Sequence, residues 1–486
     1  MSLASSAARG GAITLASQLV KVVLMLGSTV ILARLLSPHD YGLVAMVVAV
    51  IGVGEIFRDF GLSMAALQAK ELTQQQQSNL FWINTAVGAV LALFFFGVSF
   101  LLGAFYGEPE VVAIAQVLSA TFLFGGVSTQ YKVSINRELR FVALAIVDLI
   151  PYVLAFVGAL TLAILFQSYW ALVAQQLIVA VATLVLAILL SRWRPGLPRR
   201  APMGGLISFG ASFAATQLVS YATRNVDSIA IGKVWGSTSL GFYDRAYNLL
   251  LLPLTQINTP MSRVAVPVLS RISEERERYV AYLRRAQLVA LYVTATLFCF
   301  LAALSTPLVV LVLGEKWEFA GQILGVLALG GVFRAIVQIA YWVYMSLGLA
   351  TAQLRFYLVA QPLLVVVILL GLPWGPMGVA VTHSVGYALF WAVSLAWASR
   401  VTKLDLRPLY FDALRAIGLF GLPAAVAAYG ASFAVSDFGP AVQVLAGGLA
   451  AIVWYAVAWL LFRRVRTDVS YLVDFVRLAL RRGKGK

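Results

Sequence analysis

The stretch from Ser220 to Leu254, SYATRNVDSIAIGKVWGSTSLGFYDRAYNLLLLPL, places full charges in surroundings that are apolar enough to lie in lipid. Embedded in it are the charged residues Arg224, Asp227, Asp244 and Arg245. A charge that faces hydrocarbon at the middle of a bilayer costs roughly 2.5–3.5 kcal/mol. The stretch therefore predicts two membrane helices whose charges face water, a partner or a ligand.

The composition of the whole chain agrees with a membrane protein. Of its 486 residues, 61% are hydrophobic and 12% are charged, whereas soluble domains carry about 25% charged residues. Apolar runs long enough to span a bilayer recur along the chain and predict an all-α integral membrane protein. We expect fourteen spans, near 12–35, 40–68, 79–104, 110–131, 141–166, 168–191, 205–234, 240–268, 283–313, 319–347, 356–372, 376–398, 411–435 and 440–462.

The placement of the basic residues predicts the orientation. Of the 36 lysines and arginines, 27 fall on the side that holds both termini, 6 lie within spans, and Arg34, Lys233 and Lys316 lie on the opposite side. Basic loops stay in the cytoplasm, so we expect both termini on the cytoplasmic side of the membrane. The net charge of +16 then reflects topology and attraction to membrane lipids. Without a compact basic module, nucleic-acid binding is not expected.

A shift of 199 residues aligns two parts of the chain without a gap. GAITLASQLV at 11–20 falls on GASFAATQLV at 210–219, and ARLLSPHDYG at 33–42 falls on GKVWGSTSLG at 232–241. Six predicted spans separate the copies, so the two halves have the same orientation. Parallel repeats imply a pseudo-twofold axis along the membrane normal and a cavity between two six-helix lobes.

The duplication predicts a domain organisation with two lobes and two additional helices. We expect an N-terminal lobe at 1–192, a cytoplasmic linker at 193–205, a C-terminal lobe at 206–400, two further helices at 401–464 and a basic amphipathic cytoplasmic tail at 465–486.

Charged residues inside the spans are the candidate functional residues. The cations other than Arg263, which is expected to reach the cytoplasmic surface, are Lys21, Arg58, Arg224, Arg245 and Arg334. The carboxylates are Glu55, Asp59, Asp148, Asp227 and Asp244. They could form ion pairs between helices, or the cations could line a wet cavity that receives an anionic headgroup, and the carboxylates could carry a coupling ion. Arg334 has no acidic residue within one turn, so its partner must come from another helix or from a ligand.

Other chemistry has no signal in the sequence. There is no Walker motif for nucleotide hydrolysis and no clustered Cys/His pattern for a metal. His39 and His383 are isolated, and we expect both to be structural. The single cysteine, Cys299, falls in a span and is expected to be a small buried hydrophobe. No catalytic residue, cofactor or metal is therefore predicted.

Four segments resemble the polysaccharide transporters of the multidrug/oligosaccharidyl-lipid/polysaccharide exporter superfamily, in particular the Wzx-type, colanic-acid-exporter-like flippases. They are ARLLSPHDYGLVAM, GEIFRDFGLSMAAL, NVDSIAIGKVWGSTSLGFYDRAYNLLLLP and LGEKWEFAGQIL, within the first 400 residues. These are mostly helix-end and packing motifs, so they identify the family better than its functional residues.

The resemblance implies two six-helix lobes, two extra helices and alternating access. The implied substrate is an undecaprenyl-diphosphate-linked oligosaccharide, moved from the cytoplasmic to the outer leaflet for export of exopolysaccharide, capsule or O-antigen. Cationic cavity residues of such flippases engage the diphosphate or acidic sugars. By this resemblance the role falls to Arg58, Arg224 and Arg334, followed by Lys21 and Arg245. Polymerase and other polysaccharide-assembly proteins are the implied protein partners.

Two other functions remain open at this point. A drug–cation antiporter of the same superfamily would favour acidic and aromatic residues in its cavity, whereas basic residues predominate here. A membrane glycan polymerase or ligase would need a sizeable outward loop to bind its acceptor, and the predicted outward loops are short. The sequence therefore favours a transporter over an enzyme.

Overall fold

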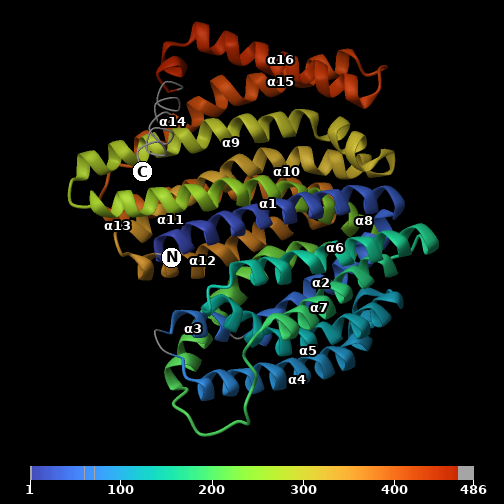
Figure 1. Ribbon diagram of the computed structural model, residues 1–486. Coiled ribbons are helices and arrows are strands. Elements are labelled where there is room, and N and C mark those ends of the chain that lie inside the picture. Colours follow the sequence, from blue (N-terminus) through green and yellow to red (C-terminus); the bar gives the residue numbers. More distant parts are fainter. Residues whose placement is uncertain (1–2, 60, 70–71, 469–486) are drawn as a thin grey trace. The chain divides into compact units, whose positions relative to one another are not determined.

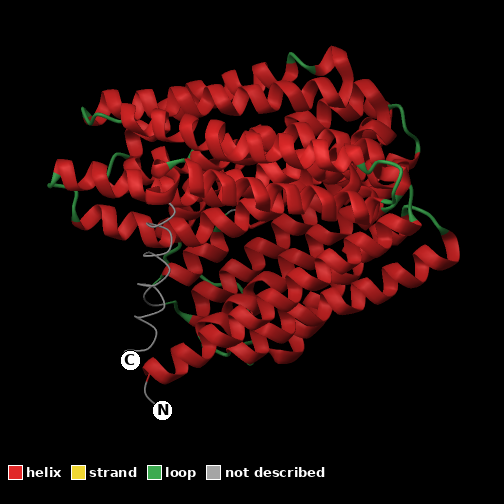
Figure 2. Cartoon of the chain, turned by 90° about the horizontal axis from the view of Figure 1, so that it is seen from above, coloured by secondary structure: helices red, strands yellow, loops and turns green. Residues whose placement is uncertain are grey.

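The computed structural model describes residues 3–59, 61–69 and 72–468 of the chain. Figure 2 shows helices joined by loops, and no strand occurs among these residues. Eleven helical stretches in this part are long and apolar enough to cross a membrane. Helix covers most of each of the fourteen predicted spans, which confirms the all-α membrane fold. Residues 469–486 of the predicted amphipathic tail lie outside the described residues.

The chain forms two compact units, Met1–Gly241 and Phe242–Lys486. The long helix α8 crosses from one unit into the other, and the lobe boundaries expected from the sequence stay a prediction. The remaining helices of the first unit are α1 (Leu3–Leu35), α2 (Pro38–Asp59), α3 (Leu62–Gln68), α4 (Gln74–Tyr106), α5 (Glu110–Arg137), α6 (Phe141–Phe166) and α7 (Trp170–Leu190), and α8 is Gly204–Arg271.

The second unit contains the end of α8 and the helices that follow it. They are α9 (Arg276–Leu313), α10 (Glu318–Ile336), α11 (Gln338–Ser346), α12 (Ala350–Leu369), α13 (Gly375–Thr402), α14 (Arg407–Ala416), the π-helix Ile417–Gly421, α15 (Leu422–Ala434) and α16 (Pro440–Leu461). Helix α9 passes Pro307 without interruption.

The packing of the helices follows the same order in both units. In the first unit α4 packs on α5, and α7 packs on both α5 and α6. In the second unit α9 packs on α10, and α13 packs on both α10 and α12. Helices α15 and α16 pack on each other and on α9 (Figure 1), and they form the additional pair that the sequence predicts.

Each of two equivalent glycines of the repeat lies against the backbone of the other copy. A Cβ atom on Gly42 would overlap the carbonyl oxygen of Ser237, and one on Gly241 would overlap the carbonyl oxygen of Pro38. Pro38 and Ser237 are themselves 199 residues apart, as are Gly42 and Gly241. Such an exchange of contacts is what a twofold relation between two copies produces. The contact explains why both copies have glycine there.

Two other glycines mark where helices bend or end. In α8, Gly236 has φ 78° and ψ 179°, a conformation that glycine adopts more easily than other residues. The predicted spans 205–234 and 240–268 meet at this kink. The predicted span 40–68 is interrupted, because α2 ends at Asp59 and Gly61 (φ 65°) precedes α3.

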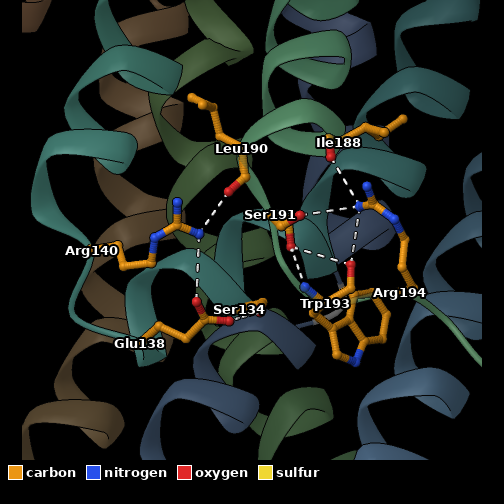
Figure 3. A network of polar contacts seen from close by, with 8 residues as sticks. All are labelled: Ser134, Glu138, Arg140, Ile188, Leu190, Ser191, Trp193 and Arg194. Atoms are coloured by element: carbon orange, nitrogen blue, oxygen red, sulfur yellow. Dashed lines mark hydrogen bonds and ion pairs between the residues drawn. The ribbon is translucent and has the colours of Figure 1, made fainter.

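The first unit has no helix between Ser191 and Met203, and arginines fix the start of this segment (Figure 3). Arg140 Nη1 donates to the Leu190 carbonyl at 2.7 Å. Arg194 Nη1 donates to the carbonyls of Ile188 at 3.0 Å and Ser191 at 3.1 Å. Carbonyls at a helix C-terminus lack partners within the helix, so these cations stabilise the end of α7.

The same segment is held along the start of α4. A capping box fixes that start, since Gln76 N donates to Thr73 Oγ1 at 3.1 Å and Thr73 N donates to Gln76 Oε1 at 3.0 Å. Side chains of α4 then donate to backbone carbonyls of the segment, from Gln74 to Arg194 and from Asn79 to Arg199. The segment is thus an ordered part of the first unit.

Candidate functional site

Arg58 lies near the end of α2 and is paired within its own helix. Its Nη2 is 2.9 Å from Glu55 Oε2, and the two side chains are 21% and 37% exposed. A Cβ atom on Gly125 of α5 would overlap Arg58 Nη1, so glycine leaves room for the guanidinium. This contact is an ion pair, one of the two arrangements that the sequence leaves open for the charged residues within spans. Arg58 Nε is buried without a hydrogen-bond partner among the described residues.

The other candidates of the first unit have different surroundings. Lys21 Nζ of α1 lies 4.0 Å from the ring centroid of Tyr152 on α6, a cation–π contact. Asp59 accepts a hydrogen bond from Ser63 at the start of α3. Asp148 of α6 pairs with Lys132 Nζ of α5 at 2.7 Å, with both side chains partly exposed.

Arg224 and Asp227 lie in the part of α8 that belongs to the first unit. The Arg224 side chain is exposed, whereas Asp227 is only 4% exposed. Asp227 Oδ1 accepts from the Ser228 backbone N–H at 2.9 Å. Their pairing is one of the arrangements that the sequence leaves open, and it stays a hypothesis.

In the second unit, Arg245 is held by its neighbour in the chain. Arg245 Nη2 is 2.6 Å from Asp244 Oδ2, and the two side chains are 18% and 21% exposed. Asn248, one turn further along α8, donates to the same carboxylate oxygen at 3.0 Å. Asp244 is thereby fixed in place beside Arg245.

Arg334 of α10 lies among aromatic side chains that other helices supply. Its guanidinium carbon is 5.2 Å from the ring centroid of Tyr247 on α8 and 4.8 Å from that of Tyr387 on α13. Arg334 Nη1 donates to Tyr247 Oη at 3.0 Å and lies 3.3 Å from His383 Nε2. We refer to Tyr247, His383 and Tyr387 as the aromatic box. These partners come from other helices, one of the two sources that the sequence leaves open for Arg334.

The three side chains of the aromatic box contact Arg334 as neutral groups. An arginine only donates, so His383 Nε2 must accept, and the ring proton then lies on Nδ1. His383 is 1% exposed, and its Nδ1 has no hydrogen-bond partner in the described part of the chain. A neutral imidazole and two phenols hold the guanidinium without supplying a compensating negative charge.

Arg334 also lies at mid-depth in its apolar stretch. That stretch runs over Glu315–Ser346, so Arg334 is 19 residues from its start and 12 from its end. His383 is one turn from Tyr387 on α13, and Tyr247 is one turn from Tyr243 on α8. The box is not among the features predicted from the sequence. These one-turn spacings of aromatic residues are the signal that could have found it.

Among the described residues, no group of His, Cys, Asp or Glu side chains could hold a metal ion. The candidate residues therefore offer charge, hydrogen bonding and aromatic surface. These groups suit the binding of a phosphorylated or sugar-bearing molecule, because arginine recognises phosphate and phenol rings pack against apolar faces.

The sequence matches the family described as "Polysaccharide biosynthesis protein" over residues 31–321. The chain is 30% identical to "Teichuronic acid biosynthesis protein TuaB" of Bacillus subtilis over 62% of its own length and 63% of that protein. It is 23% identical to "Lipopolysaccharide biosynthesis protein WzxC" of Escherichia coli, over 80% of the chain and 79% of that protein.

Two solved structures with a similar fold are described as a flippase and a transporter. The "Lipid II flippase MurJ, inward closed conformation" matches with a TM-score of 0.70 and 15% identity, covering 93% of this chain and 98% of that one. An inward-facing "multidrug resistance MATE family transporter of the MOP superfamily" matches with a TM-score of 0.62 and 15% identity, over 80% and 96% of the two chains. At such identities the likeness shows the fold alone. The protein is a multi-pass bacterial membrane protein that belongs to the polysaccharide biosynthesis protein family, with Wzx-type relatives and the fold of the multidrug/oligosaccharidyl-lipid/polysaccharide exporter superfamily.

Proposed function

We propose that the protein is a flippase for undecaprenyl-diphosphate-linked oligosaccharide repeat units. It moves them from the cytoplasmic to the outer leaflet of the inner membrane by alternating access, and the glycan is then exported as polysaccharide. The family, the biosynthetic names of its relatives and the fold shared with a lipid II flippase support this proposal.

The observation that carries the proposal is the position of Arg334 in the aromatic box. A mid-depth guanidinium held by Tyr247, His383 and Tyr387 keeps its positive charge. Its attraction for a diphosphate is large where water is partly excluded, and its planar fork fits two phosphate oxygens at once. The flanking phenol rings offer surfaces against which sugar rings pack.

The other candidates have secondary roles in this proposal. Arg58 and Arg224 receive the same anionic group at another stage of transport, and Lys21 and Arg245 follow them. Glu55 balances Arg58, Asp227 balances Arg224, and Asp59 or Asp148 carries a coupling ion. Polymerase and other polysaccharide-assembly proteins are the proposed partners that receive the glycan.

The alternative functions fit the site less well. In a drug–cation antiporter an aromatic box would enclose an acidic residue, which attracts the cationic drug, whereas here the box encloses an arginine. A glycan polymerase or ligase would need an acceptor-binding loop, and α9–α10 and α12–α13 are joined by single turns of 3₁₀-helix. Transport without covalent chemistry is therefore the function that we propose.

Export in cells that lack their own copy of the transporter tests the function. We expect Arg334→Ala to reduce export of the glycan about 10- to 100-fold at unchanged protein abundance, because it removes charge-assisted hydrogen bonds to the diphosphate. Arg334→Lys restores part of the export, since it keeps the charge and loses the fork. Arg355→Ala, which removes an exposed arginine of α12, is the matched control. Unchanged export in the Arg334→Ala variant would contradict the proposal.

The proposed orientation has a separate test. With both termini in the cytoplasm, position 316 faces outward and position 199 faces inward. In intact cells, an impermeant thiol reagent should label Lys316→Cys and leave Arg199→Cys unmodified, with Cys299 replaced by Ser in both. Labelling at 199 alone would reverse the orientation.

A further inference from the structure

A cavity of about 460 Å³ lies in the second unit, where α9, α14 and the chain after α16 meet. Four arginines and two aspartates line it, namely Arg284, Arg285, Arg415, Arg464, Asp412 and Asp468. The cavity is distinct from the aromatic box, with which it shares no residue. None of these side chains has a part in the proposed transport site.

The two aspartates hold two of the arginines in fixed positions. Asp412 is 2% exposed, and its carboxylate is 2.8 Å from Arg284 Nε and 3.3 Å from Arg415 Nη2. Asp468 is 6% exposed and lies 2.8 Å from the same Arg415 nitrogen. Tyr292 donates a further hydrogen bond to Asp468 at 3.0 Å. The carboxylates thus act as supports that orient guanidinium groups at the wall.

The wall keeps an excess of positive charge. Its four arginines and two aspartates leave a net charge of +2. Arg285 and Arg464 are exposed, and Arg284 is 42% exposed. A partly enclosed cavity with net positive charge attracts an anion, and several guanidinium forks directed at one space favour a phosphate group. The buried Arg415 Nε has no hydrogen-bond partner among the described residues.

The neighbouring surface indicates where that phosphate comes from. On α14, Phe411 and Leu414 are 72% and 56% exposed, and Arg415 follows them directly. On α16, Leu460 and Leu461 are 61% and 69% exposed, and Arg464 follows three residues later. Large exposed apolar side chains on a membrane protein face lipid tails. Arginines placed where such a surface ends lie at the level of the lipid phosphates.

We propose that this cavity is a binding site for the phosphate group of an anionic phospholipid headgroup. The bound headgroup connects α9 with α14 and with the chain after α16, and so fastens the additional helices to the rest of the second unit. The proposal is independent of the flippase function, because it concerns a resident lipid and other residues.

Thermal unfolding of the purified full-length protein in detergent tests the site. We compare phosphatidylglycerol, phosphatidylcholine and inorganic phosphate as additives. The test variant is Arg285→Gln with Arg464→Gln, which leaves the ion pairs of Asp412 and Asp468 intact. The matched control is Arg271→Gln with Arg463→Gln, which removes two exposed arginines that do not line the cavity. No lipid-linked sugar is present, so the flippase proposal does not influence the result.

We expect phosphatidylglycerol to raise the unfolding temperature of the wild type and the control, and phosphatidylcholine and inorganic phosphate to leave it unchanged. The test variant should need roughly thirtyfold more phosphatidylglycerol for the same shift, because each of the two missing arginines contributes about 1 kcal/mol near the membrane surface. If the double variant does not fold, the single change Arg464→Gln should need about fivefold more. Equal responses of the test variant and the control would overturn the proposal. Equal stabilisation by inorganic phosphate would overturn the lipid as the source.

Discussion

The arginines Arg58 and Arg334 lie in different units and are balanced in different ways. Arg58 has a carboxylate one turn away on its own helix and a glycine on α5 that leaves room for it. Arg334 is held by a histidine and two tyrosines from other helices. The Glu55 carboxylate balances the charge of Arg58, whereas the groups that the aromatic box supplies to Arg334 are neutral. We therefore expect that Arg58 mainly stabilises the fold and that Arg334 mainly binds the substrate.

The largest loss of stability is expected when the ion pair between Arg58 and Glu55 on α2 is broken. Arg58→Ala leaves Glu55 with an uncompensated charge and should lower the stability of the folded protein by about 1–3 kcal/mol. Its abundance in membranes should fall accordingly. The double change Arg58→Ala with Glu55→Ala should restore abundance, because the unpaired charge is gone. Normal abundance of the single variant would show that Arg58 is not needed for stability, and Arg58 would then be a candidate for substrate binding like Arg334.

A smaller effect is expected from filling the space beside Arg58. Gly125→Ala adds a methyl group that would overlap the guanidinium, and such overpacking costs about 1–2 kcal/mol. Gly97→Ala on α4 is the matched control, since a Cβ atom there meets nothing within 4 Å. The melting temperatures of the purified variants measure the difference. Equal values would show that Arg58 moves aside without cost.

The smallest effect is expected at the pair of Lys132 and Asp148. Both side chains are partly exposed, and such pairs contribute about 0–1 kcal/mol. Asp148→Asn should therefore change abundance little, and unchanged export would leave Asp59 as the carrier of the coupling ion. If it abolishes export at normal abundance, Asp148 carries a coupling ion, and its pairing with Lys132 is part of the transport cycle.

The sequence predicts most of the fold because the relevant signals are local or repeated. The apolar runs identify the helices, and Gly42 and Gly241 recur at one offset because each approaches the backbone of the other copy. The break at Gly61 was missed, since an apolar run continues across it and a positive φ leaves no mark on hydrophobicity. The kink at Gly236 falls between two predicted spans, and the chain is helical on both sides of it.

The candidate site is predictable only where the partners are close in sequence. Glu55 and Arg58 share a helix face at a spacing of three, so their contact follows from helix geometry. Lys132 and Asp148 are 16 residues apart, and Arg334 is 87 residues from Tyr247 and 49 from His383. Those contacts depend on which helices pack together, and single-sequence patterns do not specify this. His383 was therefore interpreted as isolated, although the fold places it against Arg334.

Direct binding of undecaprenyl diphosphate to the purified protein tests the central claim that Arg334 receives a diphosphate. The titration compares the wild type, Arg334→Ala and the control Arg355→Ala, with undecaprenol as the ligand that lacks phosphate. We predict that Arg334→Ala weakens binding of the diphosphate about 10- to 100-fold and leaves binding of undecaprenol unchanged, because only charge-assisted contacts are lost. Equal affinity of the wild type and Arg334→Ala for undecaprenyl diphosphate would contradict the account.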